Sequence, residues 1–390
     1  SLSCSHARAV TMRRAAFSSA RLAFGAHCPP SCRAPVVLPR AFSSDASASI
    51  VGDSGEASRP RPATLSDSPT GEDAPGTFFE LDDYKKHFPR GLQDSDLETM
   101  FTRLGGRPCL MVRPPALAII DAMRSASSSP GARLFYLDSD GVRGTGKTSQ
   151  LLHAVHYARH SGWLVLHIPR GRDLVSGGLW VEEGADGLLD QPHVAQQLLR
   201  DFAAVHRAQL AKVPVSDEGV KKQYGSQATL ADVTDAGAND EQTAAAAFVD
   251  LSVELAGQTT LPVLVAIDEA NCIVEPTAYH YKREQVEPEQ LSIIRALKVL
   301  ADGLQNGVVV AAESNSFPVA HRNGEFKQEL GGGGGQTLPV ADFTPEEYNK
   351  TLAFFDDAGV LNGLAEAEAG LMKMQTQLNP RQVLRRIILM

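Results

Sequence analysis

The sequence lacks any uninterrupted run of eighteen apolar residues, and we therefore expect no membrane-spanning helix. It also has little cysteine, with five residues in 390. Cys4, Cys28 and Cys32 lie near the start, whereas Cys109 and Cys272 are far apart and have no histidine or cysteine at ligand spacing. These features argue against a disulfide scaffold and a zinc site, and they agree with a reducing compartment.

Acidic residues are absent from residues 1–44, which contain six arginines, no lysine and many serines. Such a start is typical of a mitochondrial transit peptide, which we place at residues 1–43 with matrix-protease cleavage at Arg40–Ser43. Met12 fits an initiating residue. A disordered basic tail is the alternative. The prediction is a protein of the mitochondrial matrix.

Acidic residues outnumber basic ones in the rest of the chain. The whole sequence has a formal net charge of −9, and removing the six arginines of residues 1–44 leaves −15. An acidic body argues against a broad basic face for nucleic acid, although local basic patches stay open.

The middle of the chain alternates strand and helix patterns after a predicted disordered tether at residues 44–77. A short strand is predicted at residues 132–137, and apolar segments of strand length occur at residues 163–168, 261–267 and 307–312. Strands this apolar indicate an α/β fold with a mostly parallel sheet covered by helices. We predict a nucleotide-binding domain with an N-terminal extension at 78–340, an insertion or mobile loop at 213–242, and a smaller α-helical C-terminal subdomain at 341–390. A capping box at Thr344–Glu347 opens that subdomain.

Residues Gly141–Thr148 match the P-loop pattern G-x-x-x-x-G-K-[ST] in full, between a predicted strand and a predicted helix. The glycines allow a tight turn whose N–H groups point at phosphate oxygens, and the positive end of the next helix faces the same anion. Lys147 is expected to reach the β- and γ-phosphates, and Thr148 to bind Mg²⁺. The phosphate-binding candidates are Gly141, Arg143, Gly144, Thr145, Gly146, Lys147, Thr148 and Ser149. The loop predicts a purine nucleotide (GTP or GDP, or ATP or ADP) with Mg²⁺.

Two acids follow a hydrophobic strand about 120 residues downstream of the P-loop, which is the Walker B arrangement. Asp268 is expected to hold Mg²⁺, through water. Glu269 is placed to polarise an attacking water as a general base. The alternative for Glu269 is an idle acid, because hydrolysis also needs an arginine finger.

Two further positions fit the phosphate sensors of AAA-like folds. Asn315 or Ser314 follows the strand at 307–312 and can read a γ-phosphate, although a plain turn fits as well. Arg381 follows Asn379-Pro380 and can contact phosphate, whereas a helix cap with a solvated arginine is the alternative.

Two further patterns bear on the choice of base and on metal binding. No guanine-reading [NT]-K-x-D motif is present, which excludes a Ras-like domain but not guanine binding by other contacts. His153, His156 and His160 share one side of a helix; they form either a ligand face or a surface stripe, and we favour the stripe because no fourth ligand is evident.

Several segments together resemble one known family, and Trp163–Pro169 is the most specific of them. The others are His87–Leu92, Leu110–Leu117, Gly144–Thr148, Leu261–Asp268 with Asn271, Lys282–Glu284, Pro288–Leu291 and Asn379-Pro380. Over roughly residues 78–390 the chain resembles the P-loop proteins of the mitochondrial ribosomal small subunit, also called the death-associated protein three family.

The resemblance implies an AAA-like P-loop fold in the head of the small subunit, near a bridge to the large subunit. It implies a single copy beside small-subunit ribosomal proteins and rRNA, and a bound purine nucleotide, commonly guanine. Two features depart from animal relatives, which tend to have Asp-Gly where this chain has Asp268-Glu269 and to lack Arg381. Both departures favour a fuller ATPase-like site.

Two functions remain open from the sequence. The first is a structural ribosomal protein that holds its nucleotide and has at most weak GTPase or ATPase activity. The second is a free mitochondrial ATPase switch of the AAA or STAND type, which requires oligomerisation and an arginine finger in trans.

Overall fold

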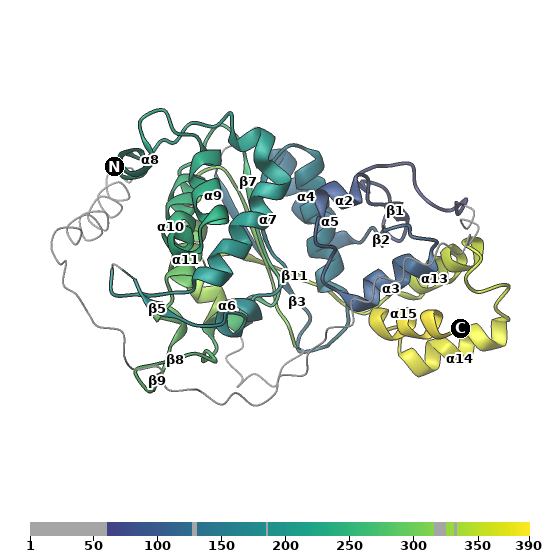
Figure 1. The fold of residues 1–390 in the computed structure, drawn as a ribbon. Helices are drawn as coiled ribbons and strands as arrows, with labels where there is room; N and C mark the ends of the chain where they lie inside the picture. Colours follow the sequence, from purple (N-terminus) through teal and green to yellow (C-terminus); the bar gives the residue numbers. More distant parts are fainter. Residues whose placement is uncertain (1–60, 127–130, 185, 316–324, 331–333) are drawn as a thin grey trace, which may run out of the picture. The chain divides into compact units, whose positions relative to one another are not determined.

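The computed structural model describes residues 61–126, 131–184, 186–315, 325–330 and 334–390 (Figure 1). The predicted transit peptide and residues 44–60 of the predicted tether lie outside these residues. Across the described ranges, no helix is both long and apolar enough to cross a membrane.

A five-stranded sheet forms the centre of the fold, with the order β11-β3-β10-β7-β4 and all neighbours parallel. Its strands are β3 (Ala132–Asp138), β4 (Leu164–Ile168), β7 (Val263–Ile267), β10 (Gly307–Ala312) and β11 (Gln336–Pro339). Every residue of β7 and β10 is buried, which explains why these strands are apolar throughout rather than alternating. The predicted α/β fold with a mostly parallel sheet is confirmed.

Each face of the sheet has its own core, because successive side chains of a strand point to opposite faces. Val263, Val265 and Ile267 belong to one core and Leu264 and Ala266 to the other. The first face is covered by α7 (Pro192–Leu210), α9 (Leu230–Asn239), α10 (Glu241–Ala256) and α11 (Ser292–Gly303). The second face is covered by α4 (Pro114–Ala126) and α5 (Lys147–His160), as Figure 1 shows.

Both ends of the described chain add to the second core. The N-terminal elements are β1 (Phe78–Glu80), α2 (Tyr84–His87), α3 (Ser95–Arg103) and β2 (Cys109–Met111), and the C-terminal ones are α13 (Pro345–Asp357), α14 (Glu366–Thr376) and α15 (Pro380–Leu389). The rings of Phe78 and Phe354 stack with centroids 4.0 Å apart. The helices of residues 341–390 therefore share one core with the N-terminal extension and the sheet.

Short elements complete the fold: α6 (Arg172–Ser176), β5 (Glu182–Glu183), β6 (Leu189–Asp190), α8 (Glu218–Tyr224), η1 (Ala270–Val274), β8 (His280–Tyr281), β9 (Glu284–Gln285), η2 (Pro288–Gln290) and α12 (Glu325–Glu329). The predicted capping box before α13 is confirmed, since Glu347 N donates to Thr344 Oγ1 at 3.1 Å and Thr344 N donates back to Glu347 Oε2 at 2.8 Å.

The tether prediction is wrong for residues 61–77, which pack against the domain. Leu65 is buried in the second core, and the carbonyl of Thr70 lies 2.9 Å from Nε2 of the buried His153. The segment also donates from Thr64 N to Asp357 Oδ2 at 2.9 Å and from Gly76 N to Val112 O at 2.8 Å, and Glu72 pairs with Arg124. A low apolar content therefore does not exclude order when the polar backbone groups are satisfied.

Of the two alternatives predicted for residues 213–242, an insertion or a mobile loop, the mobile loop is wrong. The segment contains α8 and α9, and its sparse apolar residues are buried: Val213, Val215, Val220, Leu230 and Val233. A capping box at Thr229 starts α9. The polar residues between these positions face outward. The sequence of this amphipathic segment is therefore as polar as that of a loop.

Replacing Leu230 by alanine tests this assignment. The side chain is fully buried in the first core, so Leu230→Ala is expected to lower the free energy of unfolding by about 2–5 kcal/mol. Urea denaturation measures the loss, with Lys222→Ala on an exposed position as the control. Equal stability of both variants would contradict a packed role for this segment.

Candidate nucleotide site

The P-loop connects β3 to α5 at the carboxyl edge of the sheet, where the strand ends of β7 and β10 also lie. Its turns need left-handed backbone at Gly141, Gly144 and Gly146, with φ of 82°, 79° and 99°. A Cβ on Gly144 would approach within 2.7 Å of Asn379 and 2.8 Å of Arg381, so α15 packs directly on the loop. Glycine is thus required there both by conformation and by the close approach.

Lys147 is a buried cation that is held by neutral oxygens. Its ammonium donates to Ser139 Oγ and, at 3.4 Å, to the carbonyl of Val142. Burial lowers the pKa of Lys147, and no carboxylate of the described residues lies within ion-pair distance of it. A buried ammonium with no carboxylate at ion-pair distance fits a site that takes an anion.

Thr148 and Asp268 form the pair expected for Mg²⁺. The Thr148 hydroxyl donates to Asp268 Oδ2 at 2.7 Å, which joins the start of α5 to the end of β7. Burial raises the pKa of Asp268 to about 6, against the hydrogen bond from Thr148. Hydroxyl and carboxylate oxygens are the donors that Mg²⁺ prefers, so this pair fits the ion chemically.

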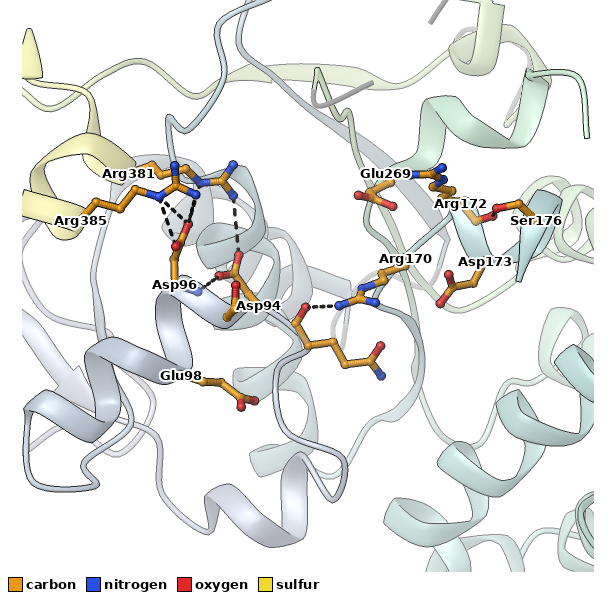
Figure 2. Close-up of a pocket in the computed structure, with 12 residues that line it drawn as sticks. Asp94, Asp96, Glu98, Arg170, Arg172, Asp173, Ser176, Glu269, Arg381 and Arg385 are labelled. Atoms are coloured by element: carbon orange, nitrogen blue, oxygen red, sulfur yellow. Dashed lines mark hydrogen bonds and ion pairs between the residues drawn. The ribbon is translucent and has the colours of Figure 1, made fainter. Parts of the chain in front are cut away.

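Glu269 follows with a left-handed φ of 54°, which turns the chain sharply after the strand. Its side chain lines both the phosphate cavity and a larger outer cleft of about 720 Å³. Burial, and then the neighbouring Asp268, raise its pKa. Figure 2 shows Glu269 beside Arg172, on the opposite side of the cleft from Asp94 and Asp96.

The two predicted sensor positions differ in what they contact. Asn315 Nδ2 donates to Ser139 Oγ at 3.4 Å, next to Lys147. The guanidinium of Arg381 instead pairs with Asp96 at 3.3 Å and Asp94 at 3.8 Å, while its backbone N–H donates to Gly144 O at 3.0 Å. Arg381 is thus at the loop, and its charge is offset by α3 (Figure 2).

The structure brings most of the predicted site residues to one cavity of about 150 Å³. Its lining includes Arg143, Gly144, Thr145, Gly146, Lys147, Thr148, Ser149, Asp268, Glu269, Asn315 and Arg381. Gly141 shapes the loop and is not among the lining residues. Sequence reasoning missed Gln93, Asp94 and Asp96 of the N-terminal extension and Glu313 after β10, all of which line the same cavity.

Arg113 is a further residue that the motifs did not reveal. Its guanidinium is buried, donates to Thr145 O at 2.8 Å and pairs with Glu347 at 2.8 Å. It also donates to the carbonyl of Ala341 at 3.0 Å and lies over the ring of Phe343. One side chain therefore connects the N-terminal extension, the P-loop and the C-terminal helices. An arginine in the otherwise apolar segment 110–117 was the available signal.

The predicted surface stripe of histidines is wrong for two of its three members. His153 and His156 are fully buried, and only His160 is exposed. Both buried rings contact backbone carbonyls of the N-terminal segment, at Thr70 and Pro69. Among the described residues, no group of three or more His, Cys, Asp or Glu is arranged to hold a metal ion. These histidines fasten residues 61–77 to the P-loop helix.

This burial makes stability dependent on pH. Burial lowers the pKa of His153 to about 4, whereas an unfolded histidine titrates near ~6.5. Between these values the unfolded chain binds a proton that the folded chain does not, so stability falls as pH falls, by about 1.4 kcal/mol per pH unit for this residue. His153→Gln is expected to flatten the fall in urea-measured stability between pH 6.5 and 4. The exposed His193→Gln serves as the control, and an unchanged slope in His153→Gln would contradict the burial of a neutral ring.

A parallel sheet with β10 between the P-loop strand and the Asp268 strand, and a complete phosphate loop at its edge, define an AAA-like P-loop protein. A family model described as "Mitochondrial ribosomal death-associated protein 3" matches residues 110–386. The chain belongs to this family, and the predicted mitochondrial location is confirmed with it.

Among its relatives are two proteins named "Small ribosomal subunit protein mS29". The Mus musculus protein is 27% identical over 342 residues, covering 80% of this chain and 85% of the relative. The Bos taurus protein is 29% identical over 322 residues, covering 75% and 78%. A solved structure, the ADP form of the ORC2 protein of Aeropyrum pernix, matches with a TM-score of 0.33 and 14% identity, over 70% of this chain and 59% of that one. That likeness is too low to bear on function.

Proposed function

We propose that this protein is a structural component of the small subunit of the mitochondrial ribosome, and that it holds a purine nucleotide and Mg²⁺ at its P-loop to support mitochondrial translation. Family membership and the names of its relatives support the ribosomal part. The nucleotide part rests on one observation above all. The buried ammonium of Lys147 is surrounded by neutral oxygens at the start of a helix, where phosphate oxygens complete its coordination.

The hydrogen bonds that the P-loop carbonyls accept support a structural role for the nucleotide. Thr145 O accepts a hydrogen bond from Arg113, Gly144 O accepts one from Arg381 N, and Arg143 O accepts one from Asn379 at 2.8 Å. The carbonyls of the loop are thus held by the N-terminal extension and by α15. A ligand bound to the N–H groups of the same loop stabilises all three segments, because it binds the folded chain alone.

The net charge of the chain indicates which kinds of molecule it contacts. An acidic body favours contacts with small-subunit ribosomal proteins, with local basic contacts to rRNA. The resemblance adds a place at a bridge to the large subunit, in a single copy. It favours guanine over adenine as the base, and GTP or GDP over ATP or ADP.

One observation favours the alternative, a free ATPase switch of the AAA or STAND type. Glu269 lies directly after Asp268 and lines the phosphate cavity, where a general base for weak hydrolysis belongs. Hydrolysis also needs an arginine finger. Arg170 lines the same cavity, but its guanidinium donates to Gln93 O at 2.9 Å within the same chain. The alternative requires a partner's arginine at this cleft.

Sedimentation of a mitochondrial extract through sucrose at high salt separates the two functions. If the protein is a ribosomal component, the wild-type chain is expected to sediment with the small subunit and to show no nucleotide turnover. Migration as a free oligomer with ATP hydrolysis that depends on Lys147 would instead establish the alternative.

A further inference from the structure

Leu179 and Trp180, which precede β5, are large apolar side chains that the fold leaves in solvent. Their exposed fractions are 74% and 45%, whereas the next residue, Val181, packs against the first core. Single apolar side chains are common on protein surfaces, but two adjacent ones that include a tryptophan are typical of a contact surface. Burial of a tryptophan is strongly favourable, because its side chain covers about 150–250 Å². This apolar pair is therefore a candidate docking surface.

The segment that carries the apolar pair is fixed to the domain on both sides. Before the pair, Gly178 N donates to the Tyr279 hydroxyl at 2.6 Å. After it, Glu183 accepts hydrogen bonds from Tyr281 Oη at 2.9 Å and from Lys282 Nζ at 3.2 Å. The β5–β6 hairpin thus lies beside the β8–β9 hairpin, and Figure 1 shows β5 close to β8 and β9. A surface that is held in place loses little conformational entropy when it binds a partner.

The surroundings of the apolar pair are acidic. Residues 177–190 contain four acids and no lysine or arginine, and residues 280–285 add one acid and two bases. Three of the acids are exposed: Glu182, Glu183 and Asp186. One of the two bases, Lys282, is paired with Glu183 within the chain. The two hairpins therefore present negative charge on balance.

This charge narrows the kind of partner that fits. The acids repel the phosphates of rRNA, whose contacts with cations supply much of the affinity for nucleic acid. A second copy of the chain would bring the same acids against one another. A protein surface that combines lysine or arginine with apolar side chains has neither problem, because it covers the pair and offsets the acids.

We propose that Leu179 and Trp180, together with the acids of the β5–β6 hairpin, form a docking surface for a neighbouring ribosomal protein that presents a basic, partly apolar segment. The inference rests on the proposed ribosomal function and assigns one of its protein contacts to a place on the fold. Trp180 is the anchor, since large rigid rings carry much of the energy of protein interfaces. The basic residues of the partner are expected to lie against Glu182 and Asp186.

Photo-crosslinking in mitochondrial ribosomes tests the inference. The full chain is expressed with p-benzoylphenylalanine in place of Leu179, and ribosomes that contain it are isolated before irradiation. This probe captures protein and RNA alike, and it is expected to link to a lysine- or arginine-containing peptide of another ribosomal protein. Glu182→Lys reverses one charge near the probe and is expected to lower the crosslink yield at least about tenfold. Glu366→Lys, the same change at an exposed position of α14, is the matched control and keeps the yield.

Oxidation by hydroxyl radicals gives a second readout, which needs no probe residue. The chain has two tryptophans, and the other one, Trp163, is buried. Oxidation of Trp180 is expected to be at least about tenfold slower in the ribosome than in the free full chain, because an interface anchor is shielded from water. Leu179→Asp is expected to remove most of this protection. Leu371→Asp on α14 is the matched control and leaves it intact, since both leucines are exposed in the fold.

The results separate this inference from the proposed function. A crosslink to rRNA, to a second copy of the chain or to a peptide without basic residues overturns the inference, and so does the absence of any crosslink. Equal oxidation of Trp180 in the ribosome and in the free chain overturns it as well. Isolated ribosomes that lack the chain overturn the ribosomal function instead. The oxidation of the wild-type protein decides the matter even if a variant does not assemble.

Discussion

Lys147→Ala is expected to weaken nucleotide binding by about a hundredfold or more, which makes it the most damaging single change at the loop. The ammonium is buried and is held by Ser139 Oγ and Val142 O, so it is positioned before a ligand arrives. Charge-assisted hydrogen bonds to phosphate are strong, and the burial of Lys147 strengthens them further. Titration with nucleotide and Mg²⁺ measures the loss of affinity. The Lys147→Ala variant is also expected to carry no bound nucleotide when it is purified from cells.

The matched control is Lys85→Ala, which removes an exposed lysine of α2 away from the cavity. It is expected to bind nucleotide like the wild-type protein. A Lys147→Ala variant that retains full affinity would show that the buried ammonium has no phosphate partner. The removal of a buried cation can also stabilise the nucleotide-free fold, so thermal melting is compared with and without nucleotide.

Arg113→Ala is expected to lower the free energy of unfolding by about 3–5 kcal/mol, because it leaves the buried carboxylate of Glu347 without its partner. The same change frees the carbonyls of Thr145 and Ala341, which accept hydrogen bonds from the guanidinium. The loop and the start of the C-terminal helices then lose their common connection. Urea denaturation measures the stability, and nucleotide affinity is expected to fall with it.

A double-mutant cycle separates the ion pair from the packing of Arg113. Glu347→Gln alone and together with Arg113→Ala gives the coupling energy, which is expected to be favourable. Arg113→Lys is expected not to restore stability, since an ammonium cannot reach Glu347, Thr145 and Ala341 at once. Additive losses, with no coupling between Arg113 and Glu347, would contradict the role assigned to this pair.

Much of the sheet and the loop was predictable, because both have strong local patterns. The bounds of β10 are those predicted, at Gly307–Ala312, and the helix predicted after the P-loop is α5, at Lys147–His160. A fully buried parallel strand has to be apolar throughout, and a phosphate loop requires glycine where the backbone is left-handed. The positions of the P-loop and of Asp268 could be predicted from these two requirements.

The parts that escaped prediction depend on contacts between distant residues. Asp94 and Asp96 lie in the cavity because α3 packs beside α15, which no pattern in residues 92–97 reveals. Residues 61–77 are ordered by buried histidines of α5, and their own composition indicates disorder. Glu313 lines the cavity because β10 ends beside the P-loop strand, which the sequence after residue 312 does not reveal.

The most direct test of a resident nucleotide is a high-resolution map of the mitochondrial small ribosomal subunit isolated from cells that express this chain. We predict one copy of the protein in the particle, with a base, phosphates and a metal ion at residues 141–148, and with Lys147 on the phosphates. A particle that contains the chain with an empty loop would contradict the structural role of the nucleotide, and a particle without the chain would contradict the ribosomal function itself.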